Sequence, residues 1–268
     1  MKYLAKMALL IALCGSSFSY AANQLILGVQ DYEKTPRVLA DEFKGLATYL
    51  SGKLGQPVTV HASQSYKRYM LNSQKKRYDF IYGPPSMAME AYKSAGYEPV
   101  AKIPGVLSAS FMSLSSSDVA FPEDMKDKRI GMPDDDSLMT KLALAKLRSM
   151  KIKPESYFRR VQTFTDANDV LSALKLGLID VGVANSSLFN VWSAKGHNLN
   201  VVLATDSAPH LTFSVRGDLS AELKAKVTEA LLGAHKDPAV QGYFKNSGFP
   251  NFEATSLKDY QKVLSLVK

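Results

Sequence analysis

Residues 79–87 read DFIYGPPSM, and residues 180–188, about 100 positions later, read DVGVANSSL. In both stretches an aspartate precedes a short apolar run, which leads through a polar turn into an apolar helical pattern. Each stretch is then followed by a glycine turn, at Gly96 and Gly196, and by a further strand-like run. A repeat of this length predicts two similar units that each alternate strands with helices. Chance recurrence of an ordinary strand and helix is the alternative explanation.

Strand-like and helical patterns also alternate outside these two stretches. The expected strands are residues 25–29, 58–61, 80–82, 98–101, 157–161 and 200–204, and the expected helices lie near residues 39–50, 66–71, 87–95 and 138–150. Strands that alternate with helices favour crossover connections and a mainly parallel sheet with a helix layer on each face. The sequence therefore predicts an α/β fold of two lobes, joined by hinge strands near residues 111–114 and 211–215.

The first 21 residues have the pattern of a secretory signal peptide. Lys2 and Lys6 precede an apolar run over residues 7–14, and small residues lead to Ala21, after which we expect cleavage. The apolar run is too short to span a bilayer. We therefore expect a periplasmic protein without a membrane helix.

The composition indicates a globular chain. The 268 residues are 46% hydrophobic and 22% charged, which excludes collagen-like and intrinsically disordered classes. Cleavage would remove the single cysteine, so no disulfide or cysteine nucleophile is expected. The basic residues are densest over residues 67–77, which we interpret as a solvated helix face, and we expect no nucleic-acid partner. The expected lobes are residues 22–106 with 217–268 for lobe 1, and residues 107–216 for lobe 2.

The sequence contains no recognisable catalytic set. Nucleophile-elbow, zinc-protease, phosphate-loop and dinucleotide-binding motifs are all absent, and the four histidines occur singly. We therefore expect no enzyme, no metal site and no cofactor. The alternative, an enzyme that uses Asp135, Asp136 or His210 as an acid or base, lacks a visible nucleophile and an orienting group.

Two α/β lobes direct the carboxyl ends of their strands toward a shared cleft, where small ligands bind. The loops that follow the expected strands are residues 30–35, 61–66, 82–86, 132–137, 162–168 and 184–187, and they are rich in Tyr, Asp, Ser, Thr and Asn. This composition suits a small polar ligand, although each residue taken alone is also a common helix cap. Among residues 134–137 (DDDS), one of the aspartates or Ser137 is the natural N-cap of the helix that follows.

Three segments, in this order behind a signal peptide, resemble one known family. They are LATYLSGKLG with a following proline (residues 46–57), YDFIYGP (residues 78–84) and LGLIDVG (residues 176–182). Together they resemble periplasmic solute-binding proteins of the phosphate/phosphite/phosphonate transporter family, and the likeness covers nearly the whole mature chain. The resemblance implies a two-lobed periplasmic-binding-protein-like fold of type 2, with hinge strands between lobes that close on a ligand and present it to a membrane ABC permease.

The resemblance also implies where the ligand binds. Tyrosines that match Tyr66 and Tyr82 line the cleft in this family, and a loop that matches residues 133–138 offers hydroxyls and helix N–H groups to an anion. This chain departs from that pattern, since Asp135 and Asp136 replace hydroxyl residues and the histidine expected near residues 166–168 is missing. Carboxylates there would repel a phosphonate unless they are protonated or turned away.

Two ligand classes therefore stay open. One is a phosphate, phosphite or phosphonate held by backbone N–H groups with Tyr66, Tyr82, Ser137 and Thr165. The other is a cationic or zwitterionic molecule, for which tyrosine faces and aspartates are suitable partners. The predicted ligand-binding residues serve either class, and they are Tyr32, Tyr66, Tyr82, Gly83, Asp136, Ser137, Thr165, Asp166, Asn168 and Asn185. We expect a monomer that feeds an ABC importer, with a membrane-coupled sensor of the same fold as the alternative.

Overall fold

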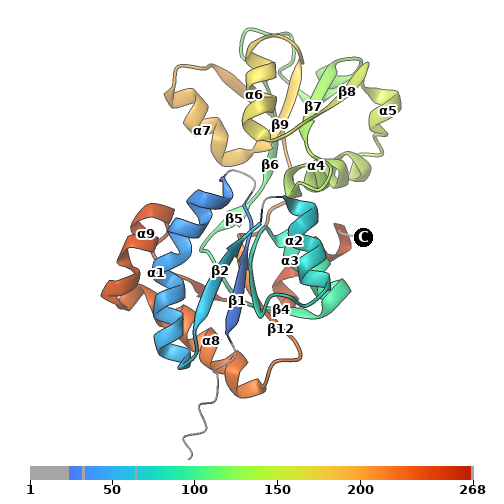
Figure 1. Cartoon of the computed structure of the whole chain (residues 1–268). Helices are drawn as coiled ribbons and strands as arrows, with labels where there is room; N and C mark the ends of the chain where they lie inside the picture. The colour runs from blue at the N-terminus through green and yellow to red at the C-terminus, as the bar shows by residue number, and fades with distance from the viewer. Residues whose placement is uncertain (1–23, 32–33, 64, 267–268) are drawn as a thin grey trace, which may run out of the picture.

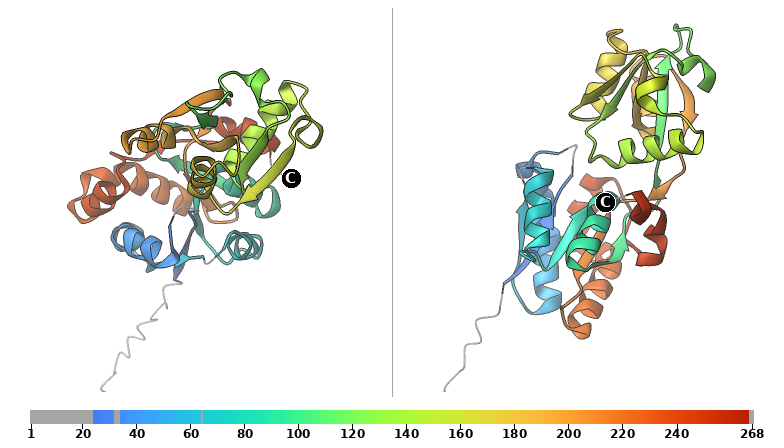
Figure 2. Two further views of the ribbon diagram at one scale, coloured as in Figure 1. Left: turned by 90° about the horizontal axis from the view of Figure 1, so that it is seen from above. Right: turned by 90° about the vertical axis from the view of Figure 1, so that its right-hand side faces the viewer.

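The computed structural model describes residues 24–31, 34–63 and 65–266 and shows two lobes stacked one above the other (Figures 1 and 2). The expected signal peptide, residues 1–21, and Tyr32 lie outside the described residues. Within the described ranges, no helix combines the length and the apolar character needed to cross a membrane.

Lobe 1 is built on a six-stranded sheet with helices on both faces. Its strands, in spatial order, are β13 (Glu253–Ala254), β4 (Tyr97–Lys102), β12 (Thr212–Arg216), β3 (Phe80–Gly83), β1 (Leu25–Val29) and β2 (Val58–Ala62). One face packs against α1 (Pro36–Leu54), α8 (Ala221–Gly233) and α9 (Gln241–Ser247), with the 3-10 turns η2 (Ala234–Lys236) and η3 (Pro238–Val240). The other face packs against α2 (Tyr66–Gln74) and α3 (Pro85–Ala95).

Lobe 2 is built on a five-stranded sheet with the same layered arrangement. Its strands, in spatial order, are β10 (Leu199–Ala204), β6 (Ala109–Leu114), β9 (Val181–Asn185), β7 (Arg129–Pro133) and β8 (Arg160–Phe164). One face packs against α4 (Leu138–Ser149), and the other packs against α6 (Ala167–Lys175) and α7 (Ser186–Ala194). The short helix α5 (Pro154–Tyr157) and the 3-10 turn η1 (Pro122–Met125) complete the lobe.

The two sheets have one topology, which confirms the two-lobed α/β fold. The order β4-β12-β3-β1-β2 of lobe 1 corresponds to β10-β6-β9-β7-β8 of lobe 2. In each lobe the strand that crosses from the other lobe, β12 or β6, runs antiparallel to its neighbours. The sheets are therefore mixed, and the parallel pairs are those of β1 with β2 and β3 and of β7 with β8 and β9. Short strands β5 (Val106–Leu107) and β11 (Ala208–Pro209) pair with each other where the chain crosses.

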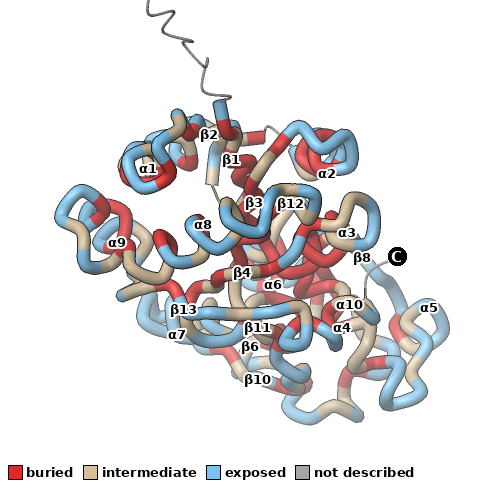
Figure 3. Tube along the Cα trace, turned by 90° about the horizontal axis from the view of Figure 1, so that it is seen from below, coloured by how far each residue is buried: buried red, intermediate tan, exposed pale blue. Residues whose placement is uncertain are grey.

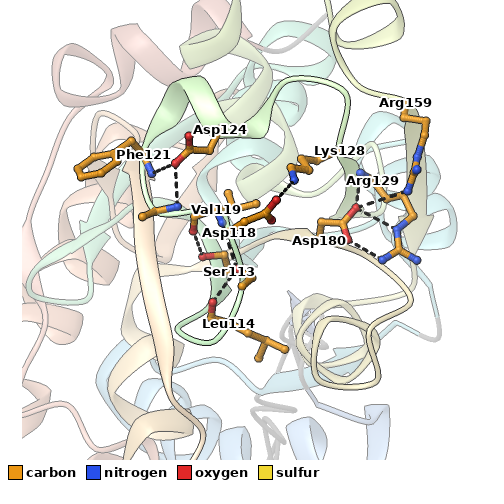
Figure 4. Close-up of polar contacts among 12 residues, drawn as sticks. Ser113, Leu114, Asp118, Val119, Phe121, Asp124, Lys128, Arg129, Arg159 and Asp180 are labelled. Atoms are coloured by element: carbon orange, nitrogen blue, oxygen red, sulfur yellow. Dashed lines mark hydrogen bonds and ion pairs between the residues drawn. The ribbon is translucent and has the colours of Figure 1, made fainter.

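The aspartates of the two aligned stretches have equivalent contacts. Asp79 Oδ2 accepts the backbone N–H of Ile26 at 2.8 Å, and Asp180 Oδ2 accepts the backbone N–H of Arg129 at 2.8 Å. Figure 4 shows that the Arg129 side chain also binds Asp180, with Nε 2.9 Å from Oδ2. Each aspartate directly precedes one strand, β3 or β9, and thus joins it to the start of the parallel strand beside it, β1 or β7.

Two glycines are equivalent in the same way. A Cβ atom on Gly28 would lie 2.5 Å from the ring of Tyr78, and a Cβ atom on Gly131 would lie 2.6 Å from Ile179 Cδ1. Tyr78 and Ile179 each immediately precede the aspartate of their lobe. The repeat therefore extends to packing, because in both lobes a bulky residue lies against a bare strand backbone.

Buried aromatic rings hold the end of β3 in place, within the buried centre that Figure 3 shows in red. The ring of Tyr82 lies 4.8 Å from that of Phe43 and 4.7 Å from that of Phe213, centroid to centroid. Phe43 in turn lies 5.1 Å from Tyr243 of α9. Aromatic side chains of three other elements, α1, β12 and α9, thus fix the position of Tyr82 near the end of β3.

The C-terminal segment contacts both lobes. The chain returns to lobe 1 with β12, and α10 (Gln261–Leu266), which follows the 3-10 turn η4 (Leu257–Tyr260), packs beside α3 and α4. Tyr260 and Val263 belong to the core that includes the buried residues of α4. The expected boundary at residue 216 would assign β12 to lobe 2, whereas β12 is hydrogen-bonded in the sheet of lobe 1. We propose a boundary close to Leu211.

Candidate functional site

A cleft of about 320 Å³ lies between the lobes, at the carboxyl ends of the parallel strands. Such volumes are typical of small-molecule sites. Its lobe 1 wall contains Asp31, Lys34, Glu42, Tyr82, Pro84, Ser247 and Phe249. Its lobe 2 wall contains Pro133, Ser137, Leu138, Met139, Thr165, Asp166, Ala167, Asn185 and Ser187. The crossing segments contribute Leu107, His210 and Leu211.

Three helices begin on the lobe 2 wall. Strands β7, β8 and β9 end at the cleft, and α4, α6 and α7 start there with Ser137, Asp166 and Asn185 as their N-caps. The prediction that Ser137 caps the helix after residue 137 is confirmed, since its Oγ accepts the Met139 N–H at 3.2 Å. Helix N-termini carry partial positive charge and attract anions. This wall therefore suits the negative end of a ligand.

The acidic loop before α4 is turned away from the cleft. Asp136 is not among the residues that line it, and Lys141 Nζ lies 3.8 Å from its carboxylate and donates to its backbone carbonyl at 2.8 Å. The backbone N–H of Asp136 donates to Asp134 Oδ1 at 2.9 Å. Burial raises the pKa of Asp136, although Lys141 acts in the opposite sense. The Asp136 carboxylate therefore lies beside Lys141 and outside the cleft lining, which avoids the predicted repulsion between this carboxylate and an anion in the cleft.

Asp166 does face the cleft, and it carries a carboxylate there. Its Oδ1 accepts the N–H groups of Asn168 at 2.8 Å and Asp169 at 2.9 Å. The Asn168 side chain lies outside the cleft lining. Thr165, just before the cap, is exposed on the same wall. The cleft thus brings together Thr165 and Asp166 but leaves out Asn168.

Tyr66 and Gly83 lie beside the cleft and not in its wall. The Tyr66 hydroxyl donates to the carboxylate of Glu90 on α3. Lys141 of lobe 2 reaches the same carboxylate at 3.2 Å, so this ion pair joins the lobes. Gly83 is buried in β3, where a Cβ atom would lie 3.2 Å from the carbonyl oxygen of Gln30. A ligand contact for Tyr66 or Gly83 stays a prediction.

The lobe 1 wall is acidic and aromatic. Lys34 Nζ lies 2.7 Å from Glu42 Oε2, and Asp31 adds a second carboxylate. Tyr82 lies at the base of this wall, and burial holds the pKa of its hydroxyl well above the ordinary value of 10, with Tyr243 beside it. Tyr82 is therefore a neutral donor and acceptor, while the wall around it favours positive charge.

Most of the lining residues were not among the predicted ligand-binding residues, and those with polar or aromatic side chains include Asp31, Lys34, Glu42, Ser187, His210 and Phe249. His210 directly precedes an expected hinge strand, and that position is the one signal that could have identified it. Lys34 and Glu42 follow the first strand but have no distinctive pattern. Phe249 enters from the C-terminal part of the chain, which sequence spacing does not connect to the cleft. Within the described ranges, no cluster of three or more His, Cys, Asp or Glu residues is suited to a metal ion.

Comparison with known proteins gives one family and one fold. A family model described as "ABC transporter, phosphonate, periplasmic substrate-binding protein" matches residues 33–260. The binding-protein component of an ABC phosphonate transporter from Pseudomonas aeruginosa is similar in structure, with a TM-score of 0.71, 17% identity, and coverage of 91% of this chain and 85% of that chain.

Two further structures are similar over nearly the same length. PhnD1 from Prochlorococcus marinus, in complex with methylphosphonate, has a TM-score of 0.74 and 14% identity, with coverage of 91% of this chain and 96% of that chain. A Xanthomonas citri protein bound to ATP has a TM-score of 0.76 and 14% identity, with the same two coverages. At these identities the likeness establishes the shared fold.

Proposed function

This chain belongs to the family of periplasmic substrate-binding proteins of phosphonate ABC transporters, and from that membership we propose that it captures a phosphonate-class oxyanion in the cleft and delivers it to a membrane ABC permease. The observation that carries the proposal is the convergence of α4, α6 and α7 on one wall of the cleft. Backbone N–H groups and helix dipoles bind oxyanions without a cationic side chain.

The lobe 2 wall holds the oxyanion in this proposal. The hydroxyls of Ser137, Thr165 and Ser187 line the wall beside the helix N-termini, and hydrogen bonds to an ionised acceptor are stronger than neutral ones. Tyr82 supplies a hydroxyl from lobe 1. A ligand that contacts both walls favours the arrangement in which the lobes approach each other, and such closure is the change a permease can recognise.

The acidic lobe 1 wall favours a second candidate, a ligand that also carries an amine. Asp31 and Glu42 lie on the wall opposite the helix N-termini, and among the described residues of that wall Lys34 is the single Lys or Arg. A zwitterion would place its oxyanion against lobe 2 and its amine against lobe 1. Aminoalkylphosphonates meet both demands, and a purely cationic ligand would meet one.

The remaining parts of the proposal follow from family membership and the N-terminal sequence. The protein works in the periplasm after removal of residues 1–21, acts as a monomer, and binds its ligand without chemical conversion. A sensor that signals through a membrane receptor would use the same cleft, and it would differ in its membrane partner.

Isothermal titration of the secreted protein tests the proposed ligand class. The probes are methylphosphonate, 2-aminoethylphosphonate, inorganic phosphate and glycine betaine. We expect both phosphonates to bind, and Tyr82→Phe to weaken them by about 10-fold through loss of one charge-assisted hydrogen bond. Tyr97→Phe is the matched control, because its hydroxyl is buried away from the cleft against the Tyr78 carbonyl oxygen at 2.6 Å.

The four probes separate the candidates. Tighter binding of 2-aminoethylphosphonate than of methylphosphonate supports the zwitterion, and the reverse order supports a simple oxyanion. Binding of glycine betaine alone would overturn the oxyanion proposal.

A further inference from the structure

His210 lies at the hinge end of the cleft, between β11 and β12. Its Nδ1 accepts the backbone N–H of Leu211 at 2.8 Å. A backbone N–H can only donate, so Nδ1 carries no proton, and a neutral imidazole must then carry its proton on Nε2. The hinge backbone thus selects one tautomer of His210.

The surroundings of His210 hold the ring in one orientation. The Phe249 ring packs edge-on against it at 5.1 Å between centroids, and the Tyr260 hydroxyl donates to the His210 carbonyl oxygen at 3.3 Å. The Leu211 carbonyl oxygen accepts the Ile103 N–H at 2.9 Å, which fixes the backbone beside it. Within the described ranges no side chain or backbone group forms a hydrogen bond with Nε2, and His210 lines the cleft.

The same surroundings keep the ring neutral. Burial lowers the pKa of His210 to about 4, and the positive charge of Lys102 on β4 adds to this effect. Lys102 is itself paired with Glu253. The other charged groups that line the cleft with His210 are Asp31, Lys34, Glu42 and Asp166. Protonation of Nδ1 would also break the hydrogen bond from the Leu211 N–H. This hydrogen bond and the burial of the ring therefore both favour the neutral imidazole.

We propose that His210 determines specificity in this cleft, by donating a hydrogen bond from Nε2–H to an acceptor oxygen of the ligand. The inference rests on the proposed function, since it assigns one contact within the same cleft. A neutral donor favours an oxygen acceptor and opposes an ammonium group, which has no lone pair to offer. An amine on the ligand is therefore directed to Asp31 and Glu42, away from the hinge.

Two substitutions separate the donor from the structural role of the ring. In His210→Asn the amide oxygen can still accept the Leu211 N–H, but nothing reaches the position of Nε2. In His210→Gln the amide nitrogen reaches that position. We expect His210→Asn to weaken methylphosphonate binding by about 10- to 100-fold and His210→Gln to weaken it much less. His197→Asn is the control, because His197 packs on Trp192 outside the cleft lining.

Nitrogen NMR of the ring tests the tautomer without a ligand. We expect Nε2 protonated and Nδ1 unprotonated from pH 8 to pH 5, with parallel pH profiles of methylphosphonate affinity for the wild type and His210→Gln. A ring that titrates near pH 6.5, or equal affinities for the wild type and His210→Asn, would overturn the inference. Failure of the wild type to bind any phosphonate would instead count against the proposed function, and the NMR result would still decide the tautomer.

Discussion

At the scale of single residues, the repeat can be tested most directly at Gly28 and Gly131, where a bulky side chain packs against the strand backbone. A methyl group on Gly131 would overlap Ile179, and the strand or the side chain would have to shift. Overpacking of this kind costs about 1–3 kcal/mol. We expect Gly131→Ala and Gly28→Ala each to lower the free energy of unfolding by that amount in urea titrations.

Gly52, inside α1, provides the matched control for these glycines. Nothing lies within 4 Å of a Cβ atom built there. Alanine in an exposed helix interior is favoured over glycine by about 0.5–1 kcal/mol. Gly52→Ala should therefore raise the free energy of unfolding, and a loss similar to that of Gly131→Ala would contradict the steric explanation.

Asp180 gives a prediction that depends on pH. The hydrogen bond from the Arg129 side chain is the main reason that the pKa of Asp180 is lowered. A carboxyl whose pKa falls on folding stabilises the protein above its unfolded value of about 3.9, and this stabilisation is lost as the pH falls further. Asp180→Asn should cost about 1–2 kcal/mol at pH 7 and much less at pH 3 in urea unfolding. An equal cost at both pH values would refute the role of the charge.

Residue types at strand ends were the most predictable part of the site. Tyr82, Ser137, Thr165, Asp166 and Asn185 all line the cleft, because each lies at or within a few residues of the carboxyl end of a strand that faces it. The direction in which each side chain points was not predictable from the spacing of residues in the sequence. Asp136 and Ser137 are neighbours, yet one is drawn toward Lys141 and the other caps α4 at the cleft.

At the scale of elements, the start of α6 combines a cap with an unfavourable charge. The Asp166 carboxylate satisfies two N–H groups of α6, but it also places negative charge where an oxyanion would bind. Asparagine caps helices about as well as aspartate. Asp166→Asn should therefore leave the melting temperature nearly unchanged and tighten methylphosphonate binding several-fold at low salt, with a smaller gain at high salt.

Asp169→Asn is the control for this prediction. Asp169 lies in the first turn of the same helix but outside the cleft lining. Its substitution should change affinity little. An equal gain from both variants would show that only the overall charge of the helix matters.

Local turn chemistry explains the one element that the sequence pattern misplaced. Residues 157–161 were expected as a strand, whereas α5 occupies Pro154–Tyr157 and β8 begins at Arg160. Proline at the first helical position favours a short helical turn there. The apolar and aromatic residues around Tyr157 suggested a strand because a single turn is too short to show helical periodicity.

At the scale of the whole molecule, the pair between Glu90 of α3 and Lys141 of α4 joins the two lobes. The side chains are only 20% and 13% exposed, so solvent screens the pair weakly. Lys141→Met should allow a wider range of lobe orientations, measured as a larger radius of gyration by small-angle scattering without ligand. Lys146→Met on the same helix should leave the radius of gyration unchanged. Equal radii for the two variants would show that the Glu90–Lys141 ion pair does not hold the lobes together.

The two-lobed plan was predictable because its signal is repeated and periodic. The packing of the C-terminal segment was not. Tyr260 and Val263 join the core that contains the buried residues of α4, although more than 100 residues separate them in the chain. Hydrophobic periodicity identifies a helix, but it does not identify which distant surface the helix covers.

The return of the chain to lobe 1 sets the order in which the two sheets can form during synthesis. The sheet of lobe 2 draws all its strands from residues 109–204, a single uninterrupted stretch. The sheet of lobe 1 has β12 as an inner strand and β13 as an edge strand, and both come later in the chain than the last strand of lobe 2. Domains form as their residues become available, from the N-terminus onward. The lobe that begins the chain is therefore the one that finishes folding last.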